Sequence, residues 1–291
     1  HPAWVGEIDR AAVALFMQLS AVPAPRTIYR GISKLAPGTY LEIDVPSGAE
    51  THHTYWDAQS VAAQGLADPF PGSADEAADA VESLLKQALA GQMVADVPLG
   101  AFLSGGVDSS TVVALMQSLS ARPVKTFTIG FDAHGYDEAQ EARAVAHHLG
   151  TDHTELYVTE REARDVIPRL PGIYCEPFGD ASQIPTFLVA ELARRHVTVA
   201  LSGDGGDELF AGYSRYGLAR AYWPTLARIP AGVRHAAASL VTGISAGAWD
   251  SALRLPLALV PKGKRPARLG EQLHKAATVA SARDGEALYR A

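Results

Sequence analysis

The stretch Leu103-Ser104-Gly105-Gly106-Val107-Asp108-Ser109-Ser110 joins an apolar run to a helical pattern. The preceding run, Pro98–Leu103, is short, apolar and bounded by chain breakers, which predicts a buried strand. From Val107 to Leu119, apolar residues recur at helical spacing and predict a helix. Glycines let a backbone approach a ligand closely, and the N–H groups at a helix start attract phosphate. The stretch therefore predicts a strand, a phosphate-binding turn and a helix.

Asp108 is unexpected in such a turn, because a carboxylate repels phosphate. A divalent cation such as Mg²⁺ between the two would explain it, since Mg²⁺ takes both carboxylate and phosphate oxygens. The alternative is an ordinary capped helix, because Asp and Ser are common at helix starts. The G-x-x-x-x-G-K loop is excluded because Gly106 stands in place of the lysine. The dinucleotide motif G-x-G-x-x-G is excluded at Gly203–Glu208, which lacks the last glycine.

The composition of the chain favours a globular protein that acts on small molecules. Its 291 residues can form one large domain or two small ones, and 47% apolar residues allow a proper core. The net charge of −7 argues against a nucleic-acid surface, and no apolar run is long enough for a membrane span. The single cysteine, Cys175, excludes an internal disulfide and fits a cytoplasmic location. We expect this thiol to be buried and structural.

Strands and helices alternate from Ser73 onward, which predicts an α/β fold with a doubly wound parallel sheet. The expected order is helix 74–92, strand 98–103, helix 107–119, strand 124–130, helix 137–149, strand 153–158, helix 159–167, helix 185–195 and strand 197–201. Ser73 and Glu76 predict a capping box at the first helix. Ligands lie beyond the carboxyl ends of such strands, so the loops that start at Ser104, Gly130 and Ser202 are expected to converge.

The two ends of the chain have different patterns. Residues 1–56 form an opening segment with a helical period over 7–19 and a strand pattern over 39–44. Residues 57–73 are rich in Gly, Pro and small side chains and predict a linker. Beyond about residue 209 the pattern is helical, with no further clear strand. We expect the chain to be a piece of a longer protein.

A second glycine-rich stretch, Ser202–Tyr213, follows the last predicted strand and contains Asp204, Asp207 and Glu208. An ordinary Gly/Asp turn is the alternative, but three clustered carboxylates repel one another unless a cation offsets their charge. Together with Leu103–Ser110, this stretch resembles the signatures of the asparagine synthetase family, within the PP-loop ATP pyrophosphatases. The segments Tyr136-Asp137-Glu138 and Gly150-Thr151-Asp152-His153 are also similar. The resemblance runs from about Thr27 to beyond Tyr216.

The resemblance implies a role for each matching position. The residues that would bind the pyrophosphate of ATP are Ser104, Gly105, Gly106 and Ser109. The residues that would contact the adenosine, largely through backbone, are Leu103, Ile129, Ser202 and Gly203. Asp108 and Asp207 would hold Mg²⁺, and Asp204 would be the catalytic group that supports formation and use of an acyl-adenylate. The acceptor side would include Glu176, Asp180 and Ser182, next to Cys175 where an Asp is typical.

The activity implied by this resemblance is that of an AMP-forming carbon–nitrogen ligase that uses ATP and Mg²⁺. Aspartate would be amidated to asparagine through an acyl-adenylate, with pyrophosphate released and ammonia drawn from glutamine in the full-length protein. The partners would be these small molecules, with neither nucleic acid nor membrane, and a homodimer is left open. Two alternatives are a related ligase acting on another acid, such as a sugar uronate or a peptide or β-lactam-type carboxylate, and an ATP-binding module without turnover.

The resemblance also implies the domain organisation. Ile28–Gly38 resembles the end of the family's N-terminal glutaminase domain. Residues 1–56 would then be the tail of that domain, residues 57–73 a linker, and residues 74–291 an ATP-binding synthetase domain that is incomplete at its C-terminal end. The family's nucleophilic N-terminal cysteine has no counterpart in this chain. We therefore expect the chain to show no glutaminase activity and to need added ammonium.

Two further patterns have simpler explanations. Gly243–Gly247 matches the nucleophile-elbow motif G-x-S-x-G, but a helical pattern precedes it where that motif needs a strand. We expect a helix end there. The histidines His52-His53, His147-His148 and His153 lack cysteines or acids at metal-ligand spacing. They are expected to be surface or half-buried side chains.

Overall fold

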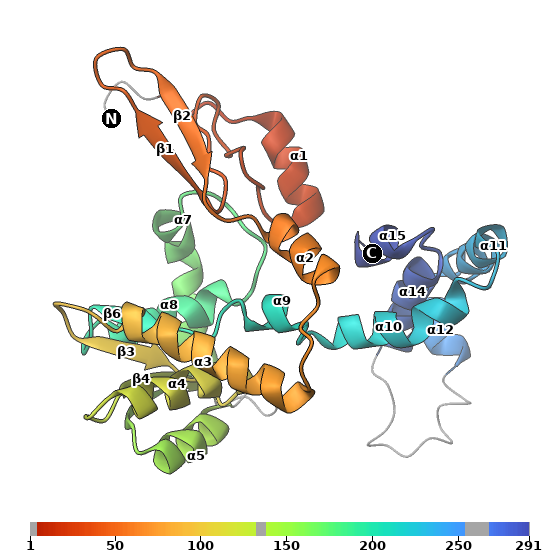
Figure 1. Cartoon of the computed structure of the whole chain (residues 1–291). Helices are drawn as coiled ribbons and strands as arrows, with labels where there is room; N and C mark the ends of the chain where they lie inside the picture. Colours follow the sequence, from red (N-terminus) through yellow and green to blue (C-terminus); the bar gives the residue numbers. More distant parts are fainter. Residues whose placement is uncertain (1–4, 132–137, 254–267, 291) are drawn as a thin grey trace. The chain divides into compact units, whose positions relative to one another are not determined.

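The computed structural model describes residues 5–131, 138–253 and 268–290. These residues divide into two compact units, His1–Asp204 and Gly205–Ala291 (Figure 1). The first unit contains the six strands of the described residues, and the second is built from helices. Tyr136 and Asp137, which belong to a segment similar to the family, lie outside the described residues.

Four parallel strands form the central sheet of the first unit. They are β3 (Leu99–Phe102), β4 (Lys125–Phe131), β5 (Asp152–Val158) and β6 (Val199–Leu201), in the order β5-β4-β3-β6. Ala101 pairs with Thr126 on one side and with Leu201 on the other. The chain adds β4 and β5 on one side of β3 and then returns to place β6 on the other. The expected parallel α/β arrangement is therefore confirmed.

Helices cover both faces of this sheet. They are α3 (Ala74–Gln92), α4 (Val107–Leu119), α5 (Ala139–Leu149), α6 (Glu160–Val166), a 3-10 turn (Ile167–Arg169), α7 (Leu170–Ile173) and α8 (Gln183–Ala193). The predicted bounds of α3 and α4 are confirmed, and the other predicted bounds differ by one or two residues. The capping box of Ser73 and Glu76 is present at the start of α3. Local sequence thus determined where these helices begin.

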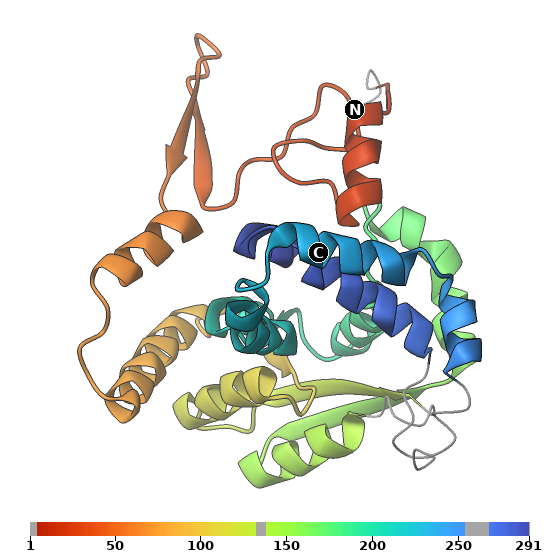
Figure 2. The same ribbon diagram turned by 90° about the vertical axis from the view of Figure 1, so that its right-hand side faces the viewer.

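Two apolar layers hold these helices to the sheet. On one face α3, α4 and α5 share a core with β3 that includes Leu103, Val113 and Met116 (Figure 2). On the other face Phe127 packs with residues of α8 and with Val197. Farther along the same face, Val158 packs with Val166 and other apolar residues. The sheet therefore lies between two helical layers, as a doubly wound topology requires.

The N-terminal part contains two elements that the sequence did not predict. Its elements are α1 (Arg10–Leu19), β1 (Thr39–Ile43), β2 (Glu50–Thr54) and α2 (Ala58–Ala67). The strand β2 pairs antiparallel with β1, although its sequence, Glu-Thr-His-His-Thr, has no apolar residue. The helix α2 occupies most of the expected linker and has no buried residue. Polar and exposed elements of this kind give little hydrophobic periodicity to detect.

The second unit consists of α9 (Gly206–Phe210), α10 (Ser214–Leu226), α11 (Ala231–Thr242), α12 (Ala246–Ala252), α14 (Leu269–Ala280) and α15 (Gly285–Arg290). The helix α14 packs against α11 and α12. The G-x-S-x-G match lies between α11 and α12, where the side chain of Ser245 caps α12 by accepting a hydrogen bond from the backbone N–H of Ala248. The expectation of a helix end is confirmed. No helix among the described residues is long and apolar enough to cross a membrane.

Candidate functional site

The turn between β3 and α4 is shaped by hydrogen bonds among its own serines. The Ser104 backbone N–H donates to the Ser109 hydroxyl at 3.2 Å, and the two hydroxyl oxygens lie 2.9 Å apart. The Ser104 hydroxyl also accepts from the backbone N–H of Gly106 at 3.3 Å. These contacts link the start of the turn to the first turn of α4. We refer to residues 104–109 as the phosphate loop.

Gly106 is the N-cap residue of α4 and has no side chain to cap it. The N–H groups in the first turn of a helix have no intrahelical acceptor, so here they remain available to a ligand. The helix dipole adds a partial positive charge at the same place. Ser104 is exposed, whereas Ser109 is buried and has an exposed fraction of 8%. The loop can therefore offer backbone N–H groups and the Ser104 hydroxyl to an anion. The buried Ser109 hydroxyl stabilises the loop through its hydrogen bonds with Ser104.

Gly105 shows how tightly the phosphate loop is packed. Its φ of +80° lies in the left-handed region that favours glycine. A Cβ at this position would lie 2.7 Å from the Cβ of Glu141 and 2.8 Å from the backbone nitrogen of Ala142, both in α5. Glycine is therefore required here both by its backbone angle and by the close approach of α5.

The loop after β6 lies against the phosphate loop. A Cβ at Gly203 would lie 2.6 Å from the backbone nitrogen of Ser109. β3 and β6 are parallel neighbours, and the order of strand addition reverses between them. Ligands in open α/β sheets bind at such a switch point, beyond the carboxyl ends of the strands. The structure therefore brings Ser104–Ser109 and Ser202–Gly203 together, as the strand order required.

The acidic residues of the two loops differ in their surroundings. Asp108 is half-buried in the first turn of α4. Asp204 is exposed, and its carboxylate accepts a hydrogen bond from the Ser202 hydroxyl at 3.0 Å. Asp207 is half-buried in the first turn of α9, which belongs to the second unit. Asp108 belongs to the first unit and Asp207 to the second, and their shared Mg²⁺ site stays a prediction.

Leu103 and Ile129 lie in strands or directly after them. Leu103 is buried, with 1% of its surface exposed, and its backbone N–H donates to the carbonyl of Phe127 at 2.9 Å. The side chain of Ile129 packs against the apolar cluster around Val158. Both side chains are therefore part of the core, which agrees with the expectation that any contact to adenosine is made by backbone. That contact itself stays a prediction.

Glu176, expected on the acceptor side, is bonded to the N-terminal part of the chain. Its carboxylate forms an ion pair with Lys34 and accepts the backbone N–H of Ile28 at 3.0 Å. Lys34 and Glu176 also line a cavity of about 680 Å³, together with Cys175. Sequence reasoning did not find this link, because Glu176 lies far from Ile28 and Lys34 in the chain. The acceptor role of Glu176 stays a prediction.

Asp180 and Ser182 are exposed and contact each other. The Ser182 backbone N–H donates to Asp180 at 2.8 Å, and this hydrogen bond lowers the pKa of the Asp180 carboxyl. Cys175 is exposed, so the expectation of a buried thiol was wrong. Cysteine is buried on average, but position 175 belongs to an irregular segment between α7 and α8 that stays at the surface.

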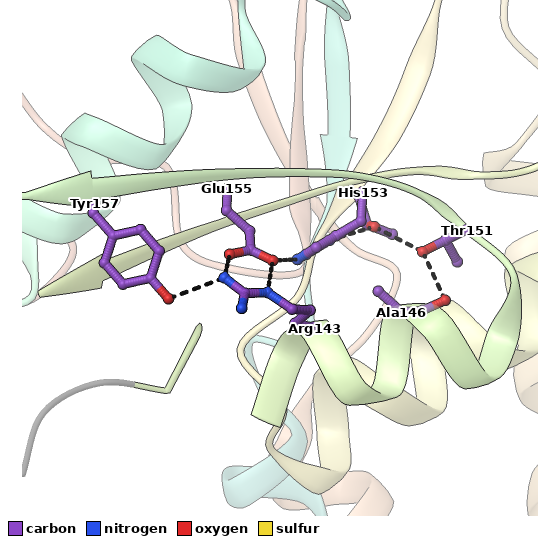
Figure 3. A network of polar contacts seen from close by, with 7 residues as sticks. Arg143, Ala146, Thr151, His153, Glu155 and Tyr157 are labelled. Carbon is purple, nitrogen blue, oxygen red and sulfur yellow. Dashed lines mark hydrogen bonds and ion pairs between the residues drawn. The ribbon is translucent and has the colours of Figure 1, made fainter. Parts of the chain in front are cut away.

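A polar network between α5 and β5 was also missed (Figure 3). The Arg143 guanidinium makes two parallel hydrogen bonds to the Glu155 carboxylate, with its Nε donating at 2.7 Å. Nη2 of Arg143, which makes the second of these hydrogen bonds, also donates to the Tyr157 hydroxyl at 3.2 Å. His153 Nδ1 lies 2.8 Å from the hydroxyl of the buried Thr126, and its Nε2 lies 3.6 Å from Glu155. The network thus ties α5 to β5 and, through His153 and Thr126, to the neighbouring strand β4.

The contacts and the burial within this network shift the pKa values of Arg143, His153 and Glu155. The hydrogen bonds from Arg143 hold the pKa of Glu155 below its ordinary value and raise the pKa of Arg143. Burial lowers the pKa of His153, because the charged imidazolium loses its hydration. The alternation of His153, Glu155 and Tyr157 along one strand was the signal available in the sequence, since every second residue faces the same side. The half-buried state expected for His153 is confirmed.

Comparison with known proteins places this geometry in a family. The family model described as Asparagine synthase matches residues 80–290, which include the phosphate loop and the loop after β6. The chain belongs to the asparagine synthase family. A putative asparagine synthetase [glutamine-hydrolyzing] 2 of Methanocaldococcus jannaschii is 39% identical over 208 residues, covering 71% of this chain and 39% of the relative.

Other members of the asparagine synthase family and its relatives are similar over the same part. Asparagine synthetase [glutamine-hydrolyzing] 1 of Bacillus subtilis is 34% identical over 242 residues, which cover 82% of this chain and 37% of that protein. A protein named amidase chry2 from Gibberella zeae is 30% identical over 211 residues, or 65% of this chain and 30% of its own length. The chain thus spans about two fifths or less of the length of these relatives.

Proposed function

We propose that this chain carries the ATP-binding, amide-forming part of an enzyme that converts aspartate to asparagine. A carboxylate is a poor electrophile for ammonia. Attack of the carboxylate on the α-phosphate of ATP forms an acyl-adenylate and releases pyrophosphate. Ammonia then attacks the activated carbonyl, and AMP leaves. The enzyme is thus an AMP-forming ligase, and glutamine supplies the ammonia in the full-length protein, in keeping with the names of the relatives.

The observation that carries this proposal is the uncapped start of α4 at the switch point of the sheet. The phosphate loop presents backbone N–H groups beyond the carboxyl end of β3, and Gly203 packs beside it. Such an arrangement suits the pyrophosphate part of a nucleotide. Oriented N–H groups stabilise the negative charge that grows on pyrophosphate as it leaves. Ser104 adds a hydroxyl donor, and Ser202 and Gly203 would contact the adenosine through their backbone.

Mg²⁺ is the ion that we propose for this site. The described residues contain no group of three or more His, Cys, Asp or Glu side chains placed to hold a metal alone. Mg²⁺ is often bound by one or two carboxylates with substrate phosphates and water completing its shell, so a full protein cage is not needed. Asp108 and Asp207 would supply the carboxylates. When bound, the ion would neutralise charge on the phosphates of ATP.

The remaining roles are assigned by position. Asp204 would support the adenylate, with its carboxylate held by the Ser202 hydroxyl. Glu176, Asp180 and Ser182 would lie on the acceptor side. Residues 74–291 would form a PP-loop domain, residues 57–73 its linker, and residues 1–56 the tail of a glutaminase-like domain. A cytoplasmic location and a homodimer belong to the same proposal.

Exchange of labelled pyrophosphate into ATP tests this function. The chain, or the full-length protein that contains it, is assayed with Mg·ATP and with aspartate, another acid, or no acid. Stimulation by aspartate is expected, and Asp108→Asn is expected to abolish it by weakening Mg·ATP binding. Asp96→Asn, at an exposed acid before β3, is the matched control and should behave as the wild type. Exchange without any acid, or none under any condition, would contradict the proposal.

Amide formation on a different acid is the second candidate. Two relatives are named amidases, chry2 of Gibberella zeae and chyE of Penicillium rubens, at 30% and 28% identity. Cys175, on the expected acceptor side, departs from the Asp that is typical there. Exchange that responds to a sugar uronate or a peptide carboxylate but not to aspartate would select this candidate. Cys175→Asp would then be expected to move the response toward aspartate.

A further inference from the structure

The helix α5 forms one wall of the phosphate loop. The Cα of Gly105 lies so close to α5 that a Cβ there would be 2.7 Å from the Cβ of Glu141. Ala139, Ala142 and Ala146 of α5 are almost completely buried, which lets the helix lie flat against its neighbours. At Gly105 there is no room for a side chain between the loop and this helix. A small shift of α5 would therefore be transmitted directly to Gly105.

The contacts that fix α5 laterally are polar. Arg143 follows Ala142 directly in α5, and its guanidinium holds Glu155 and Tyr157 of β5. One turn later the Ala146 carbonyl accepts the Thr151 hydroxyl at 3.5 Å. The strand β5 is fixed in turn by the contact between His153 and Thr126 of β4. This chain of contacts runs from the centre of the sheet to the helix that touches the phosphate loop (Figure 3).

Most exposed ion pairs contribute little, so the geometry of this pair matters. The Arg143 side chain is 58% exposed, but the Glu155 side chain is only 15% exposed. Two parallel N–H donors meet the two oxygens of one carboxylate, an arrangement that adds directional precision to the charge attraction. Lysine cannot reproduce it, because its ammonium group is a point charge. The ion pair between Arg143 and Glu155 can therefore both attach α5 to β5 and fix the orientation of α5 relative to that strand.

We propose that Arg143 and Glu155 are positioning residues for the phosphate loop. Through α5 they hold Gly105 in the conformation that accepts the pyrophosphate part of a nucleoside triphosphate. Neither residue needs to touch the nucleotide. The inference rests on the proposed function for the identity of the ligand, but the order of the loop can be measured without any ligand.

The first test is hydrogen exchange of the nucleotide-free chain. In Arg143→Met, the backbone amides of residues 103–110 are expected to exchange roughly tenfold faster, because local openings near the loop become easier. Arg143→Lys should lie between Arg143→Met and the wild type. Arg164→Met is the matched control: it removes an exposed ion pair with Glu160 on α6 and should leave these amides unchanged. Equal loop exchange in Arg143→Met and Arg164→Met would overturn the proposal.

The second test is Mg·ATP affinity by calorimetry, at a temperature where thermal unfolding shows each variant to be folded. The expected loss in Arg143→Met is about five- to tenfold, as for a typical coupling between two sites. A purely structural role would lower the unfolding temperature and leave the affinity of the folded protein unchanged, which would also overturn the proposal. Glu155→Gln, which is nearly isosteric, should give a smaller loss and replaces Arg143→Met if that variant does not fold.

The two tests separate the inference from the proposed function. If the wild-type chain binds no ATP, the proposed function fails, and the exchange measurement still decides whether Arg143 and Glu155 order the loop. If the wild type binds ATP and the loop amides do not respond to Arg143→Met, only the positioning role fails. Faster exchange together with weaker binding supports both.

Discussion

Thr126 and Phe127 are neighbours in β4, yet they show two different ways of holding a sheet together. Both are almost completely buried, with exposed fractions of 0% for Thr126 and 1% for Phe127. Phe127 faces α8 and packs with Leu192 and Val197, where only shape and apolar area matter. Thr126 faces α5 and contacts His153 through a hydroxyl. Apolar contacts tolerate repacking, whereas hydrogen bonds fix direction. The directional contacts lie on the face that also carries the phosphate loop, in addition to the apolar core of that face. We call this side of the sheet, where Thr126 is bonded, the polar face, and the side of Phe127 the apolar face.

The largest effect is expected on the apolar face. Phe127→Ala should lower the free energy of unfolding by about 3–5 kcal/mol, because it removes a large buried ring and leaves a cavity. Urea denaturation measures this change. Tyr55→Ala is a control, since that aromatic side chain is 72% exposed, and it should change little. A loss below about 1 kcal/mol for Phe127→Ala would mean that this face is not held by packing.

The polar face should respond to the loss of one hydroxyl. Thr126→Val keeps the shape of the side chain but removes the partner of His153 Nδ1 and of the Thr151 hydroxyl. A loss of about 1–3 kcal/mol in unfolding free energy is expected, because His153 Nδ1 loses its hydrogen-bond partner and the Thr151 hydroxyl loses one of two. Thr126→Ser retains the hydroxyl and should lose less. If Val were tolerated better than Ser, packing would dominate on this face too.

The pH dependence of stability offers a sharper test of the polar face. The pKa of His153 is lowered in the folded protein by burial, although the nearby Glu155 opposes this and Arg143 reinforces it. The unfolded chain therefore binds a proton more readily, with a pKa of about 6.5, so stability should fall as the pH drops below that value. One such group can contribute at most about 1.4 kcal/mol per pH unit.

His153→Gln removes this titration and can still bond to Thr126. Its unfolding free energy should vary less between pH 7 and pH 5 than that of the wild type. His148→Gln, on the exposed side of α5, is the control. Below pH 5 both proteins should lose further stability, because the lowered pKa of Glu155 means that protonation of its carboxylate opposes folding. Parallel curves for wild type and His153→Gln would show that burial of this histidine has no energetic consequence.

The smallest effect is expected for Arg164→Met. The pair of Arg164 and Glu160 lies on α6, over the apolar face, with side chains 70% and 78% exposed. Exposed pairs at this spacing contribute little, so the Tm should move by less than about 2 °C. A larger shift in Tm would show that ion pairs also stabilise the helices on the apolar face. The two faces of the sheet would then differ less in how they are stabilised.

The sequence predicted the elements whose signals are local. The helix α3 was placed correctly because Ser73 and Glu76 cap it and its apolar residues repeat at helical spacing. The parallel sheet followed from the alternation of strands and helices. The network around Arg143 could not be predicted, because it depends on the pairing of Thr126 with His153 between two strands. Register of this kind is decided by packing across the whole sheet rather than by any short segment.

The same distinction applies to the candidate site. The strand, glycine turn and helix around residues 104–109 could be predicted because their signals are contiguous in the sequence, and the phosphate-binding role of this turn stays a prediction. The link between Lys34 and Glu176 was missed because it joins segments that no local pattern relates. Cys175 was misjudged because average burial says nothing about one position in an irregular segment. Long-range contacts and surface segments therefore account for what the sequence alone could not predict.

The contact of Gly203 with Ser109 limits how this site could be transplanted into another protein. A loop grafted as Leu103–Ser110 alone would lose the strand end that packs against the start of α4, and a host residue with a side chain at that place would collide with the helix backbone. A portable unit therefore has to include at least β3, α4 and β6 together. Protein engineers would have to move two segments that are distant in the gene but inseparable in space.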